Sequence, residues 1–358
     1  MMKKCVPYGI MSLMLFFSVT GQAQLLKVVP PADGSAYFGA FADFGPIETD
    51  VTDEKIDLFT ELSGRKIAWA YFSNHWLDGK IEFPHQAIDV CLRKGVIPYI
   101  RFSPWSEMEQ NQKDPLISMQ KIIDGDFDDQ LIVWANHAKS KNTAIMIELG
   151  PEVNGNWFPW NGKWNGGAKT TDYGDPKIPD GPERFRDAYR HVIDIFRKAG
   201  AWNITWVLHL DTNKYPDAEW NSAKYYYPGD DYIDWIGLSA FGRQLPQESW
   251  ILFPQQLKRF MPEVLEMTTQ KPILISEFGV IEDASQPDRK ATWLKQAMQS
   301  ISRGLFKNVK GVTYWHSPGW LENGKASFRI DTTPQALTSF RNEVSVPFWV
   351  SEAVVRSF

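Results

Sequence analysis

Eight short apolar segments, separated by stretches with helical periodicity, constrain the fold of this chain more than any other feature. They lie near residues 36, 66, 96, 144, 203, 232, 271 and 311, and they are rich in the β-branched and aromatic residues that favour strands. Several are nearly continuous hydrophobic runs, which is typical of a parallel sheet covered on both faces. The segments therefore predict buried parallel strands.

The stretches between these segments predict helices. Residues 52–62, 84–95, 128–140, 182–200 and 288–302 carry apolar side chains at helical spacing, and two of these stretches end in glycine. Strand and helix alternate eight times, without repeats, low-complexity tracts or long linkers. We therefore predict an α/β fold, a (β/α)8 TIM barrel, as a single domain over residues 24–358.

An open doubly wound sheet is the alternative architecture. Its dinucleotide-binding form requires G-x-G-x-x-G after the first strand, and "YFGAFADFG" does not supply it. The C-terminal tail, "VPFWVSEAVVRSF", has two interpretations, a packed final segment or an accessory contact.

The first 23 residues predict a secretory signal peptide. Two lysines precede an apolar run from Met11 to Val19, and a small-x-small cleavage site ends at Ala23. No later stretch approaches the ~20 apolar residues that a transmembrane helix needs. We expect a secreted or periplasmic protein with no membrane contact.

Composition narrows the classes of partner. Without the signal lysines, 38 Lys and Arg fall to 36 against 43 Asp and Glu, so the formal net charge moves from −5 to −7. No basic run remains, and we expect no nucleic-acid partner. Cys91 is then the one cysteine left, so the core must stabilise the fold without an intrachain disulfide. The six histidines show no metal-ligand spacing, and we expect no metal or cofactor and a monomer.

Two glutamates stand where predicted strands end. Glu152 follows the fourth strand, and Glu277 ends the seventh within "ILISEFG". In a TIM barrel such positions line the shared active site. A carboxylate there is costly to desolvate unless it is paired, hydrogen-bonded or functional, and a rim salt bridge is the alternative interpretation. Two acids flanked by tryptophans match glycoside hydrolysis, in which one acid protonates the leaving oxygen and one carboxylate attacks or activates water.

The segment around Glu152, "PEVNGNWFPWNG", resembles the acid/base segment of glycoside hydrolase family 26, a largely β-mannanase family. Four more segments resemble that family in the same order: "ERFRDAYRHVIDIFRKAGAWNITWV", "YYPGDDYIDWIGLSAFG", "KPILISEFG" and "SFRIDTTPQAL". The resemblance runs from about Tyr37 to Arg341. It implies that Glu152 is the general acid/base and Glu277 the nucleophile of a retaining endo-β-glycosidase, with β-mannan as the default polysaccharide.

The resemblance also implies sugar-binding aromatic side chains. Trp157 and Trp160 resemble a sugar platform near the acid, and Trp315 resembles the aromatic floor beneath the cleaved sugar. Trp105, after the third strand, is expected to shape the same cleft. Packing alone is the alternative for the platform rings, and Asn154 is either a loop-forming or a sugar-binding amide.

Several positions depart from the family pattern. Pro151 stands where the family usually has His, Glu148 where it has Arg, and Phe241 where it has a tyrosine that hydrogen-bonds the nucleophile. Near Asp211 the family usually has Asn. The loss of these contacts either leaves Glu277 less well positioned or is made good by another side chain, with His75, Arg101, His209 and His316 as the candidates. His209 is the preferred substitute, and a buried structural role is its alternative interpretation.

Further candidates are weaker. His316 follows Trp315 and is predicted to contact a substrate hydroxyl, His75 follows the second strand, and Arg101 is expected in an ion pair. Mixed-linkage β-glucan and β-xylan are the alternative substrates. A carbohydrate-binding barrel that has lost turnover is the alternative of another class, although retention of both glutamates argues against it.

Overall fold

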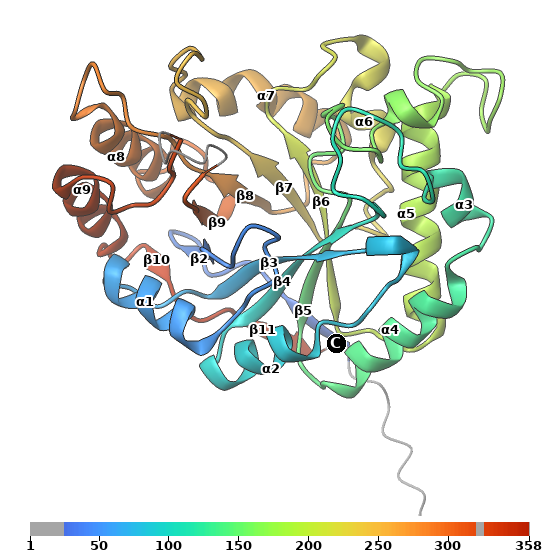
Figure 1. Ribbon diagram of the computed structural model, residues 1–358, viewed down its shortest axis with the longest axis horizontal. Coiled ribbons are helices and arrows are strands. Elements are labelled where there is room, and N and C mark those ends of the chain that lie inside the picture. Colours follow the sequence, from blue (N-terminus) through green and yellow to red (C-terminus); the bar gives the residue numbers. More distant parts are fainter. Residues whose placement is uncertain (1–24, 320–325, 358) are drawn as a thin grey trace, which may run out of the picture.

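The computed structural model describes residues 25–319 and 326–357, so the predicted signal peptide lies outside the described residues. Eight parallel strands form a closed ring with helices outside it (Figure 1). Pairing of the first barrel strand with the last closes the ring, which confirms the predicted TIM barrel. In chain order the barrel strands are β2 (Ala36–Ala42), β3 (Trp69–His75), β4 (Ile97–Ser103), β5 (Ile145–Leu149), β6 (Ile204–Asp211), β7 (Trp235–Ser239), β8 (Ile273–Phe278) and β9 (Val309–His316).

The five predicted helices are present, with boundaries that shift by up to two residues. Two long helices, α7 and α9, and two short ones, α3 and α6, were not predicted. The helices are α1 (Asp53–Ser63), α2 (His85–Lys94), α3 (Met119–Ile123), α4 (Asp128–Ser140), α5 (Asp180–Lys198), α6 (Ala223–Tyr226), α7 (Phe253–Met267), α8 (Arg289–Ser302) and α9 (Pro334–Val344). None of them is long and apolar enough to cross a bilayer.

Local sequence explains where the helices begin and end. Thr52 caps α1, because its side chain accepts a hydrogen bond from the Lys55 N–H, and Gly64 ends the helix in the left-handed conformation. Ser118 and Thr333 cap α3 and α9 in the same way as Thr52.

The lower barrel is filled by Trp69. Its indole N–H donates to Thr313 Oγ1 at 2.8 Å. Two glycines on neighbouring strands make room for the ring, since a Cβ on Gly39 would lie 2.0 Å from Trp69 Nε1 and one on Gly311 would lie 2.6 Å from Trp69 Cη2. The barrel interior is therefore packed at its base, and polar chemistry is left to the opposite end.

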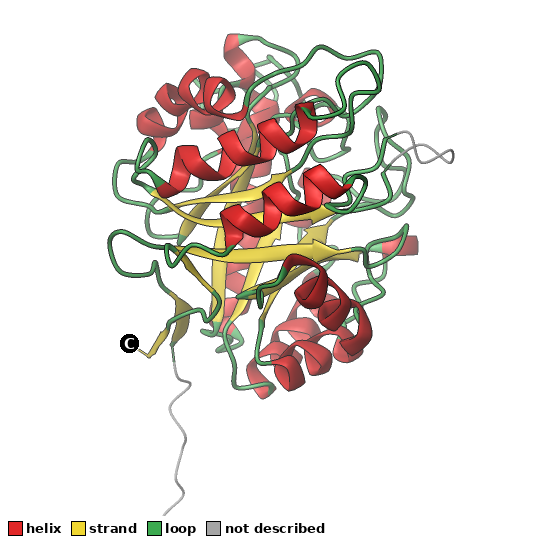
Figure 2. Cartoon of the chain, turned by 90° about the vertical axis from the view of Figure 1, so that its left-hand side faces the viewer, coloured by secondary structure: helices red, strands yellow, loops and turns green. Residues whose placement is uncertain are grey.

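The C-terminal tail packs against the base of the barrel, away from the carboxyl ends of the strands. Strand β10 (Trp349–Val350) pairs with the start of β2, and β11 (Val355–Ser357) pairs antiparallel with β1 (Leu26–Val28). The carbonyl of Val28 accepts the indole N–H of Trp235, the first residue of β7. Figure 2 shows this two-stranded ribbon at the left-hand end of the barrel. Of the two interpretations of the tail, the packed segment is confirmed.

Candidate active site

Glu277 lies near the end of β8 and is 3% exposed. Its Oε1 accepts the hydroxyl hydrogen bond of Tyr71 from β3 at 2.8 Å. Nε of Arg101, from β4, lies 3.2 Å from the same oxygen, but it forms no well-aligned hydrogen bond. The arginine also forms an ion pair with Glu48. The prediction of an ion pair for Arg101 is confirmed, and one of its partners is the nucleophile candidate.

The surroundings of Glu277 set its protonation. Burial raises its pKa to about 7, against the lowering effect of the Arg101 charge, and the Glu152 carboxylate raises it further. At neutral pH Glu277 is therefore poised between its acid and its carboxylate.

Glu152 projects from the loop after β5 in a left-handed conformation, with φ of 51°. Few residues other than glycine adopt this conformation, and it is concentrated at functional sites. Its Oε2 accepts the indole N–H of Trp157 at 2.8 Å. The loop is held by Asn154, whose amide donates to the Asp211 carbonyl at 2.8 Å and accepts from the Asp211 N–H at 2.7 Å. The side-chain acid at 152 is thus fixed by its own loop.

A third carboxyl, that of Asp211 at the end of β6, interacts with both glutamates. Burial, followed by the charge of Glu152, holds the pKa of Asp211 well above its usual range. Asp211 is hydrogen-bonded to Glu152 and also senses the charge of Glu277. The mouth of the barrel therefore carries three interacting carboxyls, and the arginine contacts only one of the three.

A fourth acid, Glu148 on β5, lies beneath them and is fully buried. Its oxygens accept from the hydroxyls of Tyr71 and Tyr99, both at 2.5 Å, and contact His209 Nδ1 at 2.9 Å. Burial lowers the pKa of His209, but the charge and hydrogen bond of Glu148, together with the charges of Glu277 and Glu152, raise it on balance. His209 Nε2 contacts Ser239 Oγ at 2.8 Å.

Among the described residues, one group of acids and histidine has ligand atoms within 4.8 Å of one another: Glu148, His209 and Glu277. These atoms already take part in hydrogen bonds with neighbouring hydroxyls, those of Tyr71, Tyr99 and Ser239. The group fits a hydrogen-bonded network, and we assign no metal to it.

The structure corrects the predictions for two aromatic platforms. Trp160 is fully buried, donates its indole N–H to the Pro151 carbonyl at 2.7 Å and stacks on Phe158. Trp315 is also buried and stacks on Phe41 with ring centroids 4.1 Å apart. Neither ring presents an open face, so the prediction that they are sugar platforms is wrong for this conformation.

Two other predicted tryptophans lie near the mouth. Trp157 is half-buried and is placed by its bond to Glu152, so its sugar contact stays a prediction. Trp105 packs edge-on against Phe158 and donates its indole N–H to His75 Nδ1 at 2.9 Å. Burial lowers the pKa of His75 to about 4, which keeps this histidine neutral and able to accept that bond.

The polar candidates are also corrected. Both amide atoms of Asn154 are used by the loop, so the loop-forming interpretation holds and the sugar-binding one is wrong. His209 is fully buried and binds Glu148, so it does not replace the lost contact to the nucleophile; Tyr71 does. His316 is buried, packs edge-on against Phe59 of the outer helix α1, and accepts the Ile330 N–H at Nδ1, so the structure does not place it for a contact with a substrate hydroxyl.

Tyr215 was missed by the sequence predictions. It lies on the loop after β6 and is 60% exposed. Its backbone pairs with the acid loop, since its N–H donates to the Asn154 carbonyl at 3.0 Å and its carbonyl accepts the Asn156 N–H at 2.9 Å. No local sequence signal marks Tyr215, because its exposure and its pairing with the acid loop both depend on the packing of two separate loops.

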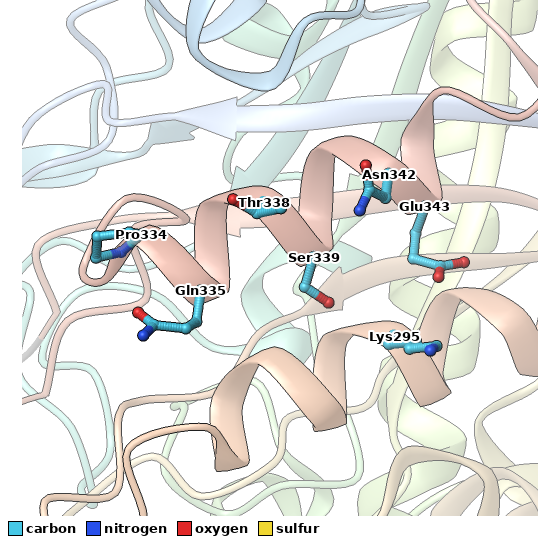
Figure 3. A pocket seen from close by; sticks show the side chains of 7 residues that line it. All are labelled: Lys295, Pro334, Gln335, Thr338, Ser339, Asn342 and Glu343. Carbon is cyan, nitrogen blue, oxygen red and sulfur yellow. The ribbon is translucent and has the colours of Figure 1, made fainter.

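A surface groove between α8 and α9 lies away from these acids (Figure 3). Lys295 lines it from α8, and Gln335, Thr338 and Asn342 line it from α9. It contains none of the groups described above, and we assign it no part in the chemistry.

A closed parallel barrel with interacting carboxyls and aromatic side chains at the carboxyl ends of its strands is the arrangement of a glycoside hydrolase. Comparison with known families identifies which one. Residues 104–308 match the model of glycosyl hydrolase family 26, and the chain belongs to that family. The resemblance found in the sequence is thereby confirmed.

Individual relatives differ in their named activity. The chain is 27% identical to Endoglucanase H of Acetivibrio thermocellus over 303 residues, which are 83% of this chain and 30% of that protein. The chain thus spans about a third of that relative.

Several solved structures with the same fold are named mannanases. A Cellulomonas fimi endo-β-1,4-mannanase double mutant superposes with a TM-score of 0.60 at 15% identity, over 89% of this chain and 72% of that one. The Bacillus subtilis mannanase BCman gives 0.57 at 14% identity, over 90% and 88%. A β-mannanase from a protist symbiont of the termite Reticulitermes speratus, complexed with gluco-manno-oligosaccharide, gives 0.56 at 13%, over 91% and 96%.

Proposed function

We propose that this protein is a secreted, retaining endo-β-glycosidase, with Glu277 as the nucleophile and Glu152 as the general acid/base. One observation carries the assignment: the two acids interact at the barrel mouth, yet only Glu277 is in contact with a cation, Arg101. A carboxylate that must attack benefits from a fixed positive charge. An acid that must donate a proton is better served without such a charge beside it.

The reaction then follows two displacements. Glu277 attacks the anomeric carbon while Glu152 protonates the glycosidic oxygen, so the C–O bond to the leaving sugar breaks and a glycosyl ester forms. Glu152, now a carboxylate, removes a proton from water as the water attacks the same carbon. The ester bond breaks, Glu277 is released as a carboxylate and Glu152 is protonated again.

For the backbone sugar we place β-glucan first and β-mannan second. Glucose and mannose differ only in the configuration at C2, so polar groups near that hydroxyl decide between them. The relative with 27% identity is named an endoglucanase, whereas the mannanase structures are 15% identical or less. Pro151 also has no backbone N–H to offer a sugar hydroxyl. β-Xylan is the third candidate.

A polysaccharide panel tests this proposal. Purified protein is incubated with mixed-linkage β-glucan, cellulose, mannan and xylan, and reducing ends are measured. We expect cleavage of β-glucan, with the β-anomer released first by NMR. Cleavage of mannan alone would reverse the order of substrates, an α-anomer would exclude retention, and binding without cleavage would favour the carbohydrate-binding alternative.

The acidic limb of the pH profile should report Glu277. Below pH 7 a growing fraction of this group is protonated and cannot attack, because its pKa is raised to about 7. We expect kcat/KM to fall about tenfold per pH unit below that value. In Arg101→Gln, which removes the charge that lowers this pKa, the limb should move to higher pH. Arg197→Gln, on the outer helix α5, is the control. If the acidic limb did not move in Arg101→Gln, the limb would not report the ionisation of Glu277.

Tyr215 is our proposed addition to the sugar-binding surface. In Tyr215→Ala we expect KM to rise about tenfold, or ~1.4 kcal/mol, with kcat little changed, because a ring outside the reacting centre binds ground and transition states alike. Trp202→Ala is the matched control, since Trp202 is an exposed ring just before β6, at the base of the barrel. Equal KM values for wild type and Tyr215→Ala would remove Tyr215 from the substrate path.

A further inference from the structure

The hydroxyl of Tyr71 lies between two carboxyls. It is 2.5 Å from Glu148 Oε1 and 2.8 Å from Glu277 Oε1. A phenol has one hydrogen, which Tyr71 retains because burial and the charges of both acids hold its pKa well above the usual range. It can therefore donate to one carboxyl at a time, and toward the other it presents only lone pairs.

Two oxygens at hydrogen-bond distance need a hydrogen between them. If Tyr71 donates to Glu148, Glu277 must be protonated and donate to the Tyr71 oxygen. If Tyr71 donates to Glu277, the extra proton must lie on Glu148. The contacts thus describe two carboxyls and one shared proton, as in other pairs of buried acids that cannot both ionise.

We propose that Glu148 and Glu277 share this single proton across the Tyr71 hydroxyl, so that Glu277 becomes the charged nucleophile when Glu148 takes the proton up. The transfer is balanced. The O–H bond of Glu277 breaks and its proton moves to the Tyr71 oxygen, while the Tyr71 hydrogen moves to Glu148 Oε1. Glu148 is therefore a positioning residue, and the proposal rests on the proposed function only for the role of Glu277.

The neighbours of the pair oppose one another. Arg101 contacts Glu277 and favours its charged form. His209 contacts Glu148 and favours the charge there, with a further hydrogen bond from Tyr99. The other titratable groups that face the pair are Glu48, Glu152, Tyr189 and Asp211. Positive charge developing on a sugar above Glu277 would shift the balance toward the charged nucleophile.

This device depends on an acid at position 148. An arginine, which the family usually carries there, keeps its proton in proteins and could not accept another. The strand register places Glu148 beside Arg101, so the cation is present on the neighbouring strand instead.

The first test needs no substrate. Side-chain carboxyl carbons of 13C-labelled glutamate are followed by NMR from pH 5 to 9, with Glu148→Gln and Glu277→Gln used to assign the signals. We expect the signals of Glu148 and Glu277 to titrate together in the wild type and separately in Tyr71→Phe. In Glu148→Gln, whose amide can donate to Tyr71 as a protonated acid would, Glu277 should ionise at least one pH unit lower.

A Glu148 signal that stays at its carboxylate position throughout, with Glu277 titrating alike in wild type and Glu148→Gln, would overturn the proposal. Glu61→Gln, the same substitution on the exposed surface of α1, is the control, because it leaves every contact of the pair intact. Tyr71→Phe keeps the test decisive if Glu148→Gln fails to fold.

The second test uses turnover. The acidic limb of kcat/KM should move at least one pH unit lower in Glu148→Gln and should stay in place in Glu61→Gln on α1. An unmoved limb in Glu148→Gln would contradict the proposal. If no polysaccharide is cleaved, the proposed function fails, and the NMR titration still decides on proton sharing. If the enzyme is active but the two signals titrate independently, the sharing alone fails.

Discussion

Replacing Glu277 with alanine should lower kcat at least about 10⁴-fold on the best polysaccharide, because no glycosyl ester can form without the attacking carboxylate. Oligosaccharide binding should remain within several-fold of the wild type, since the aromatic and backbone surfaces of the mouth are unchanged. Reducing-end release measures the first effect, and calorimetry with a non-cleaved oligosaccharide measures the second. Glu61→Ala, on the exposed surface of α1, is the matched control.

Chemical rescue sharpens this prediction. Azide occupies the space of the removed side chain, and with an activated aryl β-glycoside as substrate we expect turnover to return. From an aryl β-glycoside the product should be the α-glycosyl azide, because azide attacks from the side that Glu277 occupied. Wild-type turnover in Glu277→Ala would refute the nucleophile assignment.

The second large effect is expected for Glu152→Ala, with a loss of about 10²- to 10⁴-fold on polysaccharide. The loss should be much smaller in the first step for substrates with good leaving groups, because these do not need protonation. Such substrates should show a burst followed by slow hydrolysis, since Glu152 is also the base that activates water. Azide, which needs no base, should speed the second step and yield the β-glycosyl azide.

If turnover by Glu152→Ala fell equally for substrates with good and with poor leaving groups, Glu152 would not be the residue that transfers the proton. Trp157→Phe is the informative companion variant, because it removes the hydrogen bond at 2.8 Å to Glu152 and keeps an aromatic ring. We expect it to lower kcat on polysaccharide without abolishing turnover, because Glu152 loses the contact that positions its carboxyl.

The barrel could be predicted because its signal is local. Each strand is a short apolar run, and a run such as "ILISEF" needs no knowledge of its neighbours to be recognised. The unpredicted helix α7 has Pro262 in its interior, which weakens its helical pattern. In α9, the buried Ala336, Phe340 and Val344 do repeat at helical spacing, so that helix was open to prediction.

The site was predictable only in part, for the opposite reason. The two glutamates follow from their position after strands, which is local. Tyr71 and Glu277 are 206 positions apart in the sequence, and their contact depends on closure of the ring of strands. Burial of Trp160, His209 and His316 likewise depends on packing between distant elements. The sequence therefore could not distinguish side chains that bind sugar from side chains that only pack in the core.

The ribbon formed by β1 and β11 places residues 26–28 and 355–357 side by side at the base of the barrel. Anything attached to the protein through either segment, whether a fusion partner or a solid support, would leave from the end opposite the acids. A long insoluble chain would then approach the open end unhindered, and the pairing of these two segments suits the described barrel to circular permutation through a short linker.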